Sequence, residues 1–160
     1  MTQGTKPNHQ SEKIARKSAA RLYAVQALFQ LEASGQTVDS VQSEFLDHRF
    51  GAEVDGVEWA EGDADLFRSV TETAVNHQAA IDQLADRALV SKWPIARIDP
   101  TLRAVFRAAG AELLHSDAPV KVVITEYVRL AEAFFPEGKE KKFVNGVVDH
   151  MAREARPEDF

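Results

Sequence analysis

The 160-residue chain contains no cysteine, which excludes disulfide bonds, thiolate metal ligands and thiol nucleophiles. Long apolar runs are also missing. None reaches the ~18 residues that a membrane-spanning helix needs, and the polar N-terminus lacks the apolar core of a signal peptide. We therefore expect a cytoplasmic protein. With hydrophobic residues at 44%, the chain can form one domain, or two small lobes that share a core.

Basic residues are outnumbered, with 19 Lys and Arg against 25 Asp and Glu and a formal net charge of −6, but one end of the chain has an excess of them. Residues 1–21 contain five Lys and Arg residues and one Glu, which gives +4 against −10 for the rest of the chain. A basic arm on an acidic body favours an anionic partner that binds locally. The alternative is a solvated arm without a partner.

Apolar residues recur at spacings of three and four along most of the chain, which predicts an all-α helical bundle. Residues 1–12 are predicted to be a flexible arm, 13–154 the helical domain and 155–160 a C-terminal tail. Within the domain the pattern predicts one long helix over 64–90 and a connector that Trp93 anchors against the core. The acidic segment 51–65 is predicted to be a solvated loop, because it lacks the spacing of a calcium-binding loop.

An Asn-Gly pair near the C-terminus is the usual signal of a β-hairpin turn. Val144, Val147 and Met151 nevertheless lie on one helical stripe, and no strand pattern flanks the pair, so we predict a helix. Gly costs about 1 kcal/mol relative to Ala inside a helix. We therefore expect Gly146 to permit close approach of a neighbouring backbone, and Asn145, off the stripe, to bind a partner or ligand.

Lys13, Lys17 and Arg21 are spaced i, i+4, i+8, so we expect them on one helix face with Arg16 beside them. Such a stripe can follow a phosphate backbone, and Arg also stacks on unpaired bases. Both properties fit single-stranded RNA, whose bases are available for stacking and edge recognition. Gln26, further along the same helix, offers an amide for a base edge, but it can equally be an ordinary surface residue.

A second group of cations lies beside aromatic residues in FFPEGKEKKF (134–143). Lys139, Lys141 and Lys142, next to Phe143, are predicted to supply phosphate contacts and a stacking surface for RNA. The alternative is that Phe143 belongs to the core and that the lysines are solvated.

Other charged residues are predicted to be structural. Interhelical ion pairs are expected for Arg103, Arg107, Glu112 and Glu126, rather than an acid–base site. No metal site, cofactor site or catalytic motif is predicted.

Several motifs resemble the NusB family of bacterial transcription antitermination factors. They are K-F-V-N-G-V-V-D (142–149), A-R-L-Y-A-V-Q-A-L-F-Q (20–30), W-P-I-A-R-I-D-P-T-L-R-A-V-F-R (93–107), E-L-L (112–114), D-A-P (117–119) and V-I-T-E (123–126). Their order and approximate spacing match the family over most of residues 13–150. The chain departs at Thr125, where the family usually has Asn, and at Glu132, where it often has Lys. Its arm is also poorer in Arg than is common in the family.

The resemblance implies an all-helical fold of two packed subdomains and a protein without catalytic activity. It implies binding of the boxA segment of nascent ribosomal RNA, together with the ribosomal small-subunit protein NusE, in an RNA polymerase antitermination complex. It also favours RNA binding by the 134–143 loop and by Asn145. Phe29 is a candidate contact for the protein partner, with core packing as the alternative. The chain is expected to be a monomer or a homodimer.

Two other functions remain open at this point. One is a NusB-like domain related to RNA cytosine methyltransferases that modify ribosomal RNA, which needs a fused catalytic domain. The other is a helical module that binds only protein, in which case the basic arm is incidental.

Overall fold

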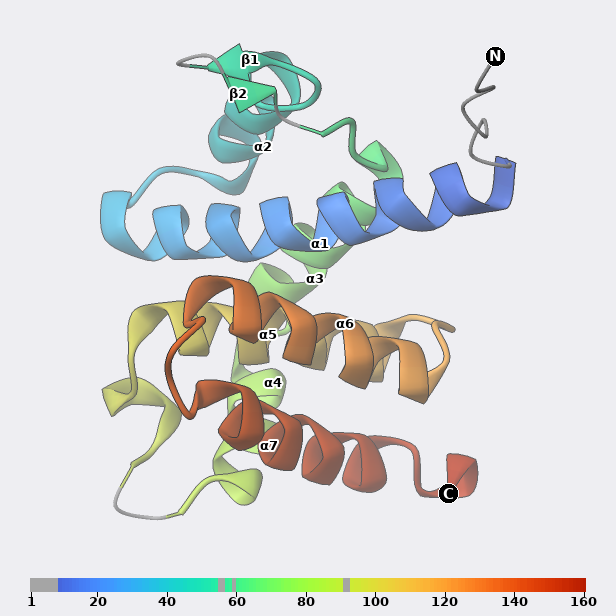
Figure 1. The fold of residues 1–160 in the computed structure, drawn as a ribbon. Coiled ribbons are helices and arrows are strands. Elements are labelled where there is room, and N and C mark those ends of the chain that lie inside the picture. Colours follow the sequence, from blue (N-terminus) through green and yellow to red (C-terminus); the bar gives the residue numbers. More distant parts are fainter. Residues whose placement is uncertain (1–8, 55–56, 59, 91–92) are drawn as a thin grey trace.

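The computed structural model describes residues 9–54, 57–58, 60–90 and 93–160, and this part of the chain is an all-α fold with one short hairpin (Figure 1). The α-helices are α1 (His9–Ser34), α2 (Val38–His48), α3 (Ala64–Asn76), α4 (Gln78–Ala88), α5 (Pro100–His115), α6 (Val120–Phe134) and α7 (Glu140–Ala155). Single 3-10 turns lie at Ile95–Arg97 and Pro157–Asp159. None of these helices is long and apolar enough to cross a membrane.

The helices form two layers that share an interface. Helix α1 packs against α2, α3 and α5, and α7 packs against α4, α5 and α6. Figure 1 shows α1 running across the molecule, with α2 on one side of it and α5, α6 and α7 on the other. This arrangement confirms the predicted all-α fold of packed helical subdomains.

Each layer has its own set of large buried side chains. In the first, Tyr23, Phe45 and Phe67 are almost fully buried, and the rings of Phe45 and Phe67 stack with centroids 5.7 Å apart. In the second, Ile81 and Met151 are fully buried between α4, α5 and α7. These positions follow the apolar period in the sequence, so burial of that stripe is what drives the helices together.

Short polar side chains fix several helix starts. Asp99 Oδ1 accepts a hydrogen bond from Thr101 N at 2.7 Å, and Pro100 occupies the first position of α5, where its missing N–H costs nothing. Asp63 caps α3 by accepting from Leu66 N at 3.0 Å. Thr37 caps α2 in the same way.

Two predictions about the middle of the chain are wrong. The expected helix over 64–90 is divided at His77, which ends α3, begins α4 and stacks its ring on His115 with centroids 4.0 Å apart. Trp93 is 60% exposed and does not anchor the connector in the core. In the acidic segment 51–65, the predicted loop contains the two short strands Glu53–Val54 and Val57–Glu58, which pair antiparallel.

The predicted flexible arm overlaps the first helix. Residues 9–12 already belong to α1, whereas residues 1–8 lie outside the part of the chain that the structure describes.

The close approach predicted at Gly146 occurs instead at Gly110. Apart from its chain neighbours and the backbone of its own helix, no heavy atom of the described residues lies within 4 Å of the position that a Cβ at Gly146 would occupy. A Cβ at Gly110 would lie 2.6 Å from Ile81 Cγ2 and 3.3 Å from Met151 Cε. The glycine that permits close packing is therefore on α5, and the account given for Gly146 is wrong.

Candidate nucleic-acid interface

Arg21 lies inside the protein and joins α1 to α5 and α6. It is 4% exposed and forms a bidentate ion pair with Glu112, with Nε–Oε2 and Nη2–Oε1 distances of 2.8 and 2.9 Å. Its Nη1 also donates to Glu126 Oε1 at 3.2 Å. Tyr127 donates its hydroxyl to Glu112 at 2.5 Å, and Ser18 donates to Glu126 at 2.6 Å. Both carboxylates of the cluster therefore have more than one donor.

Pairing and burial set the protonation states in this cluster. Burial by itself lowers the pKa of Arg21, but the hydrogen bond and the charge of Glu112 outweigh it, so the pKa is raised. Burial, and then the charge of Glu112, raise the pKa of Tyr127 well above its usual value. At neutral pH the cluster therefore contains a charged Arg21 and a neutral Tyr127.

The predicted stripe of cations on α1 is therefore incorrect at Arg21. Each step of four residues turns an α-helix by about 40° beyond a full turn, so Arg21 is rotated by about 80° from Lys13. Because of that rotation, Lys13 lies at the surface whereas Arg21 points into the core, where it pairs with Glu112 and Glu126.

The other three basic residues of the stripe remain accessible. Lys13 is exposed, and Arg16 and Lys17 are partly exposed. None of the three forms an ion pair with another described residue. The Arg16 carbonyl accepts a hydrogen bond from Asp63 N at 3.0 Å, which ties this part of α1 to the start of α3. The cations therefore project from a fixed segment of helix.

The cluster at the start of α7 is divided between two faces. Lys139, Lys141 and Lys142 are all exposed. Phe143 is 39% exposed and packs edge-to-face on buried Phe106, with ring centroids 5.8 Å apart, so it belongs partly to the core and partly to the surface. Asn145 follows Phe143 by about 200° around the helix. It lines, with Lys141, a groove against α6, so Phe143 and Asn145 do not form one stacking and hydrogen-bonding site.

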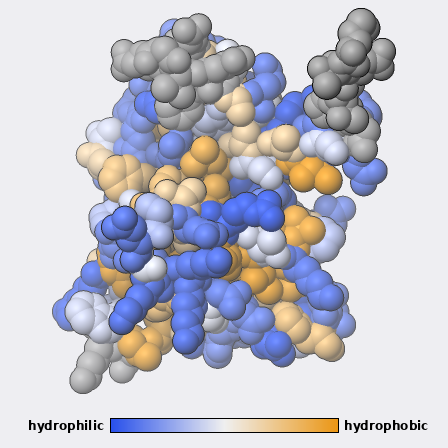
Figure 2. All heavy atoms as spheres, in the orientation of Figure 1, coloured by the Kyte–Doolittle hydropathy of each residue, from blue (hydrophilic) through white to orange (hydrophobic). Residues whose placement is uncertain are grey.

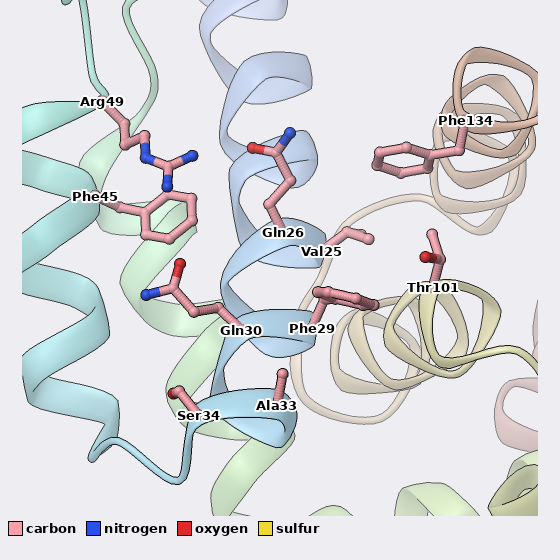
Figure 3. Close-up of a pocket in the computed structure, with 10 residues that line it drawn as sticks. All are labelled: Val25, Gln26, Phe29, Gln30, Ala33, Ser34, Phe45, Arg49, Thr101 and Phe134. Atoms are coloured by element: carbon pink, nitrogen blue, oxygen red, sulfur yellow. The ribbon is translucent and has the colours of Figure 1, made fainter.

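Phe29 and Gln26 line a cavity of about 410 Å³ between α1, α2, α5 and α6 (Figure 3). Phe29 is 42% exposed, and Phe134 of α6 and Thr101 of α5 face it across the opening. The Gln26 Oε1 atom is buried there without a hydrogen-bond partner among the described residues. Gln26 thus lies in the Phe29 cavity, not in the groove that contains Lys17.

Sequence reasoning missed a basic stripe on α6. Lys121, Thr125 and Arg129 are exposed and line a groove of about 610 Å³ together with Lys17. The two cations are spaced i, i+8 with the polar Thr125 at i+4, which is a weaker form of the signal that identified the stripe on α1. In the sequence, these polar residues are interspersed with the β-branched run and the strong apolar period of the opposite face of this helix.

The other charged residues have structural partners, as predicted. Arg103 Nε donates to Glu32 at 3.0 Å, and Arg107 forms a bidentate pair with Asp82 at 2.9 Å for both bonds. Within the described part of the chain, no group of three or more His, Asp or Glu side chains is placed to hold a metal ion.

Comparison with known proteins identifies the family. A model of the NusB family matches residues 18–153. The transcription antitermination protein NusB of Maricaulis maris (strain MCS10) is 47% identical over 152 residues, 94% of each chain. The protein of the same name from Agrobacterium fabrum (strain C58 / ATCC 33970) is 45% identical over 157 residues, 97% of this chain and 94% of the relative.

The chain belongs to the NusB family.

Solved structures agree with this assignment. Thermotoga maritima NusB superposes with a TM-score of 0.69 at 30% identity, over 89% of this chain and 95% of that one. A crystal structure of the antitermination factors NusB and NusE in complex with double-stranded RNA contains a chain that superposes with a TM-score of 0.66 at 25% identity, over 86% of this chain and 96% of that one. The family predicted from the motifs is therefore confirmed.

Proposed function

We propose that this member of the NusB family is a non-enzymatic transcription antitermination factor. It binds boxA-type single-stranded RNA of nascent ribosomal transcripts together with ribosomal protein NusE, as part of an RNA polymerase antitermination complex in the cytoplasm. The relatives named as antitermination proteins support this role over that of a methyltransferase-associated domain, since they match over 94% of their own length. A NusB chain bound to NusE and RNA has the same fold.

The observation that carries RNA binding is the set of cations on α1. Lys13, Arg16 and Lys17 have no carboxylate partner among the described residues, although the rest of the chain is strongly acidic. Their charge is therefore available to a phosphate backbone, and binding releases the counterions of that backbone. The proposed surface extends to the exposed Lys139 at the N-cap of α7 and to Lys141, Lys142, Asn145 and the exposed part of Phe143 on that helix.

Single-stranded RNA suits these side chains better than a duplex. Arg and a half-exposed aromatic ring stack on unpaired bases and reach their edges, whereas the deep major groove of duplex RNA hides those edges. The solved NusB–NusE complex contains double-stranded RNA, so both forms belong in the test.

The Phe29 cavity is the proposed contact for NusE. A 42% exposed aromatic ring at the mouth of a cavity is the kind of anchor that a protein partner covers. Gln26 lines the same cavity, and its buried Oε1 has no hydrogen-bond partner among the described residues. This interpretation replaces a base contact by Gln26 with a protein contact. Phe29→Ala should weaken NusE binding, whereas Leu114→Ala, at an exposed apolar residue outside the cavity, should not.

The deciding experiment is fluorescence anisotropy with a short boxA RNA, a scrambled RNA of equal composition and a boxA duplex, each with and without NusE and at several salt concentrations. We expect preference for single-stranded boxA, strengthened by NusE and weakened by salt. Equal, weak binding of all three RNAs that NusE leaves unchanged would contradict the proposal and favour a protein-only module. Tighter binding of the duplex would contradict the single-strand assignment alone.

A further inference from the structure

Two grooves on the surface of α6 meet at the same two residues. The first lies between α1, the α5–α6 turn and α6, has a volume of about 610 Å³ and contains Lys17. The second lies between α6 and α7, has a volume of about 340 Å³ and contains Lys141 and Asn145. Thr125 and Arg129 line both. The two grooves therefore form one continuous depression that leads from α1 across α6 to α7.

Figures 1 and 2 show this arrangement from the side on which α6 and α7 lie. Helix α6 runs between α1 and α7, so a molecule that contacts both of them on this face crosses α6 (Figure 1). Figure 2 shows mostly hydrophilic side chains over α6 and α7, with hydrophobic atoms between α1 and α6. A depression of this kind suits a polymer with a charged backbone and flat apolar bases.

The charges along the depression are unequally available. Its buried carboxylates, Glu112 and Glu126, are neutralised in part by Arg21. Glu132 is paired with Lys141 at 3.4 Å. The exposed cations Lys121 and Arg129 have no ion pair with any described residue.

The remaining acid in the depression, Asp117, is exposed and lies on the α5–α6 turn, at the α1 end. The centre of the depression on α6 therefore presents free positive charge, although the body as a whole is acidic.

We propose that α6 connects the two predicted RNA-binding regions, with Lys121 and Arg129 contacting consecutive parts of one RNA strand and Thr125 lying between them. Lys121 and Arg129 are eight residues apart, which separates them by about 12 Å along the helix axis. The strand enters beside Lys17, follows these side chains and leaves beside Asn145. This inference rests on the proposed RNA-binding function and adds Lys121 and Arg129, which neither the sequence motifs nor the cations of α1 identified.

Arg129 is suited to more than charge neutralisation. Its planar guanidinium donates two parallel hydrogen bonds to a phosphate and stacks on an unpaired base. It lies where the two grooves join, beside Thr125, so a strand that follows both grooves passes it. Lys121, with a compact charge on a flexible stem, serves as a phosphate contact.

The test compares two charge-matched double variants in anisotropy titrations with boxA RNA. Lys121→Ala/Arg129→Ala removes two cations from the depression, and Arg68→Ala/Arg97→Ala removes two exposed cations that line neither groove. We expect the first variant to bind roughly tenfold more weakly. Its slope of log K against log salt should fall by about 1.4, because each single-strand phosphate contact contributes about 0.7. The second variant should stay close to the wild type in both quantities.

A gain-of-charge pair keeps the proposal falsifiable if the double variant loses stability. Thr125→Lys adds a cation where the grooves meet, and Gln83→Lys adds one to an exposed position on α4. Thr125→Lys should strengthen RNA binding about threefold and steepen the salt dependence, whereas Gln83→Lys should do neither.

The outcomes separate this inference from the function on which it rests. If the wild type binds boxA RNA but both depression variants behave like their controls, the path along α6 is wrong and the function stands. If the wild type shows no preference for boxA, the function itself fails. If the Lys121/Arg129 variant weakens NusE binding and leaves RNA affinity unchanged, the depression holds protein, which also overturns the inference.

Discussion

Arg16 and Arg21 lie five positions apart on the same helix, yet their surroundings are opposite. Arg21 is buried and held by the carboxylates of Glu112 and Glu126. Arg16 is partly exposed and has no ion pair among the described residues. The direction in which each side chain leaves the helix decides its role, so Arg21 stabilises the fold while Arg16 is free to bind an anion. A count of basic residues in the sequence does not separate the two roles.

Gly110 and Gly146 repeat this contrast without charge. Gly110 faces Ile81 and Met151 at a distance that leaves no room for a methyl group, whereas Gly146 faces open space. In both pairs the residue type is the same and only its position on the helix differs. The same substitution is therefore expected to affect the two members of each pair differently.

The largest expected effect is that of Arg21→Ala. Removing the guanidinium leaves two buried carboxylates without their cation, and breaking a buried pair in this way costs about 3–5 kcal/mol. Urea unfolding monitored by circular dichroism gives the free energy of unfolding directly. Arg16→Ala is the matched control and should change that free energy by less than about 0.5 kcal/mol. Equal stability of the two variants would show that Arg21 contributes no more to the fold than Arg16 does.

The two glycine substitutions should change the free energy of unfolding by less than Arg21→Ala does, and in opposite directions. Gly110→Ala forces a methyl group against Ile81 and should destabilise the protein by about 1–3 kcal/mol. Gly146→Ala adds helix propensity in open space and should stabilise it by up to about 1 kcal/mol. The same unfolding assay applies to both. Destabilisation by Gly146→Ala would contradict the open space around Gly146 and favour the close approach predicted from the sequence.

The smallest effect concerns pH. Burial and Glu112 raise the pKa of Tyr127 in the folded state, whereas its unfolded value is about 10. The associated stability is therefore present below about pH 10 and is lost as the pH rises towards the folded pKa, by up to about 1.4 kcal/mol per pH unit.

The advantage of wild type over Tyr127→Phe should therefore shrink as the pH rises from about 9 to 11, where the unfolded tyrosine ionises. Tyr23, whose pKa is also raised, by burial first and then by the charge of Glu61, is present in both proteins. A difference between the two proteins that does not change with pH would contradict burial of a neutral Tyr127.

The sequence was sufficient for features that depend on local pattern. The apolar period predicted the all-α fold, Asp99-Pro100 marked the start of α5, and the motif around Asn145 indicated the family. The valines of that motif are buried in α7, which resolves the Asn-Gly ambiguity in favour of a helix.

Features that depend on tertiary packing were not predictable in this way. The apolar period continues through 64–90 without Gly or Pro, so nothing local marks the break at His77. The burial of Arg21 depends on Glu112 and Glu126, which lie 91 and 105 positions away. The ring of Phe143 is partly packed and partly exposed because it lies against Phe106, which is distant in the sequence.

The most direct measurement of the central claim is the salt dependence of boxA RNA affinity for wild type and for Lys13→Ala/Arg16→Ala/Lys17→Ala. Arg68→Ala/Arg87→Ala/Arg97→Ala, which changes three exposed cations elsewhere, is the charge-matched control. We expect the first variant to keep wild-type stability, to bind RNA more weakly and to lose about 2 from the slope of log K against log salt, because three phosphate contacts are removed. A folded variant that binds RNA like its control would show that the exposed cations of α1 do not carry RNA binding.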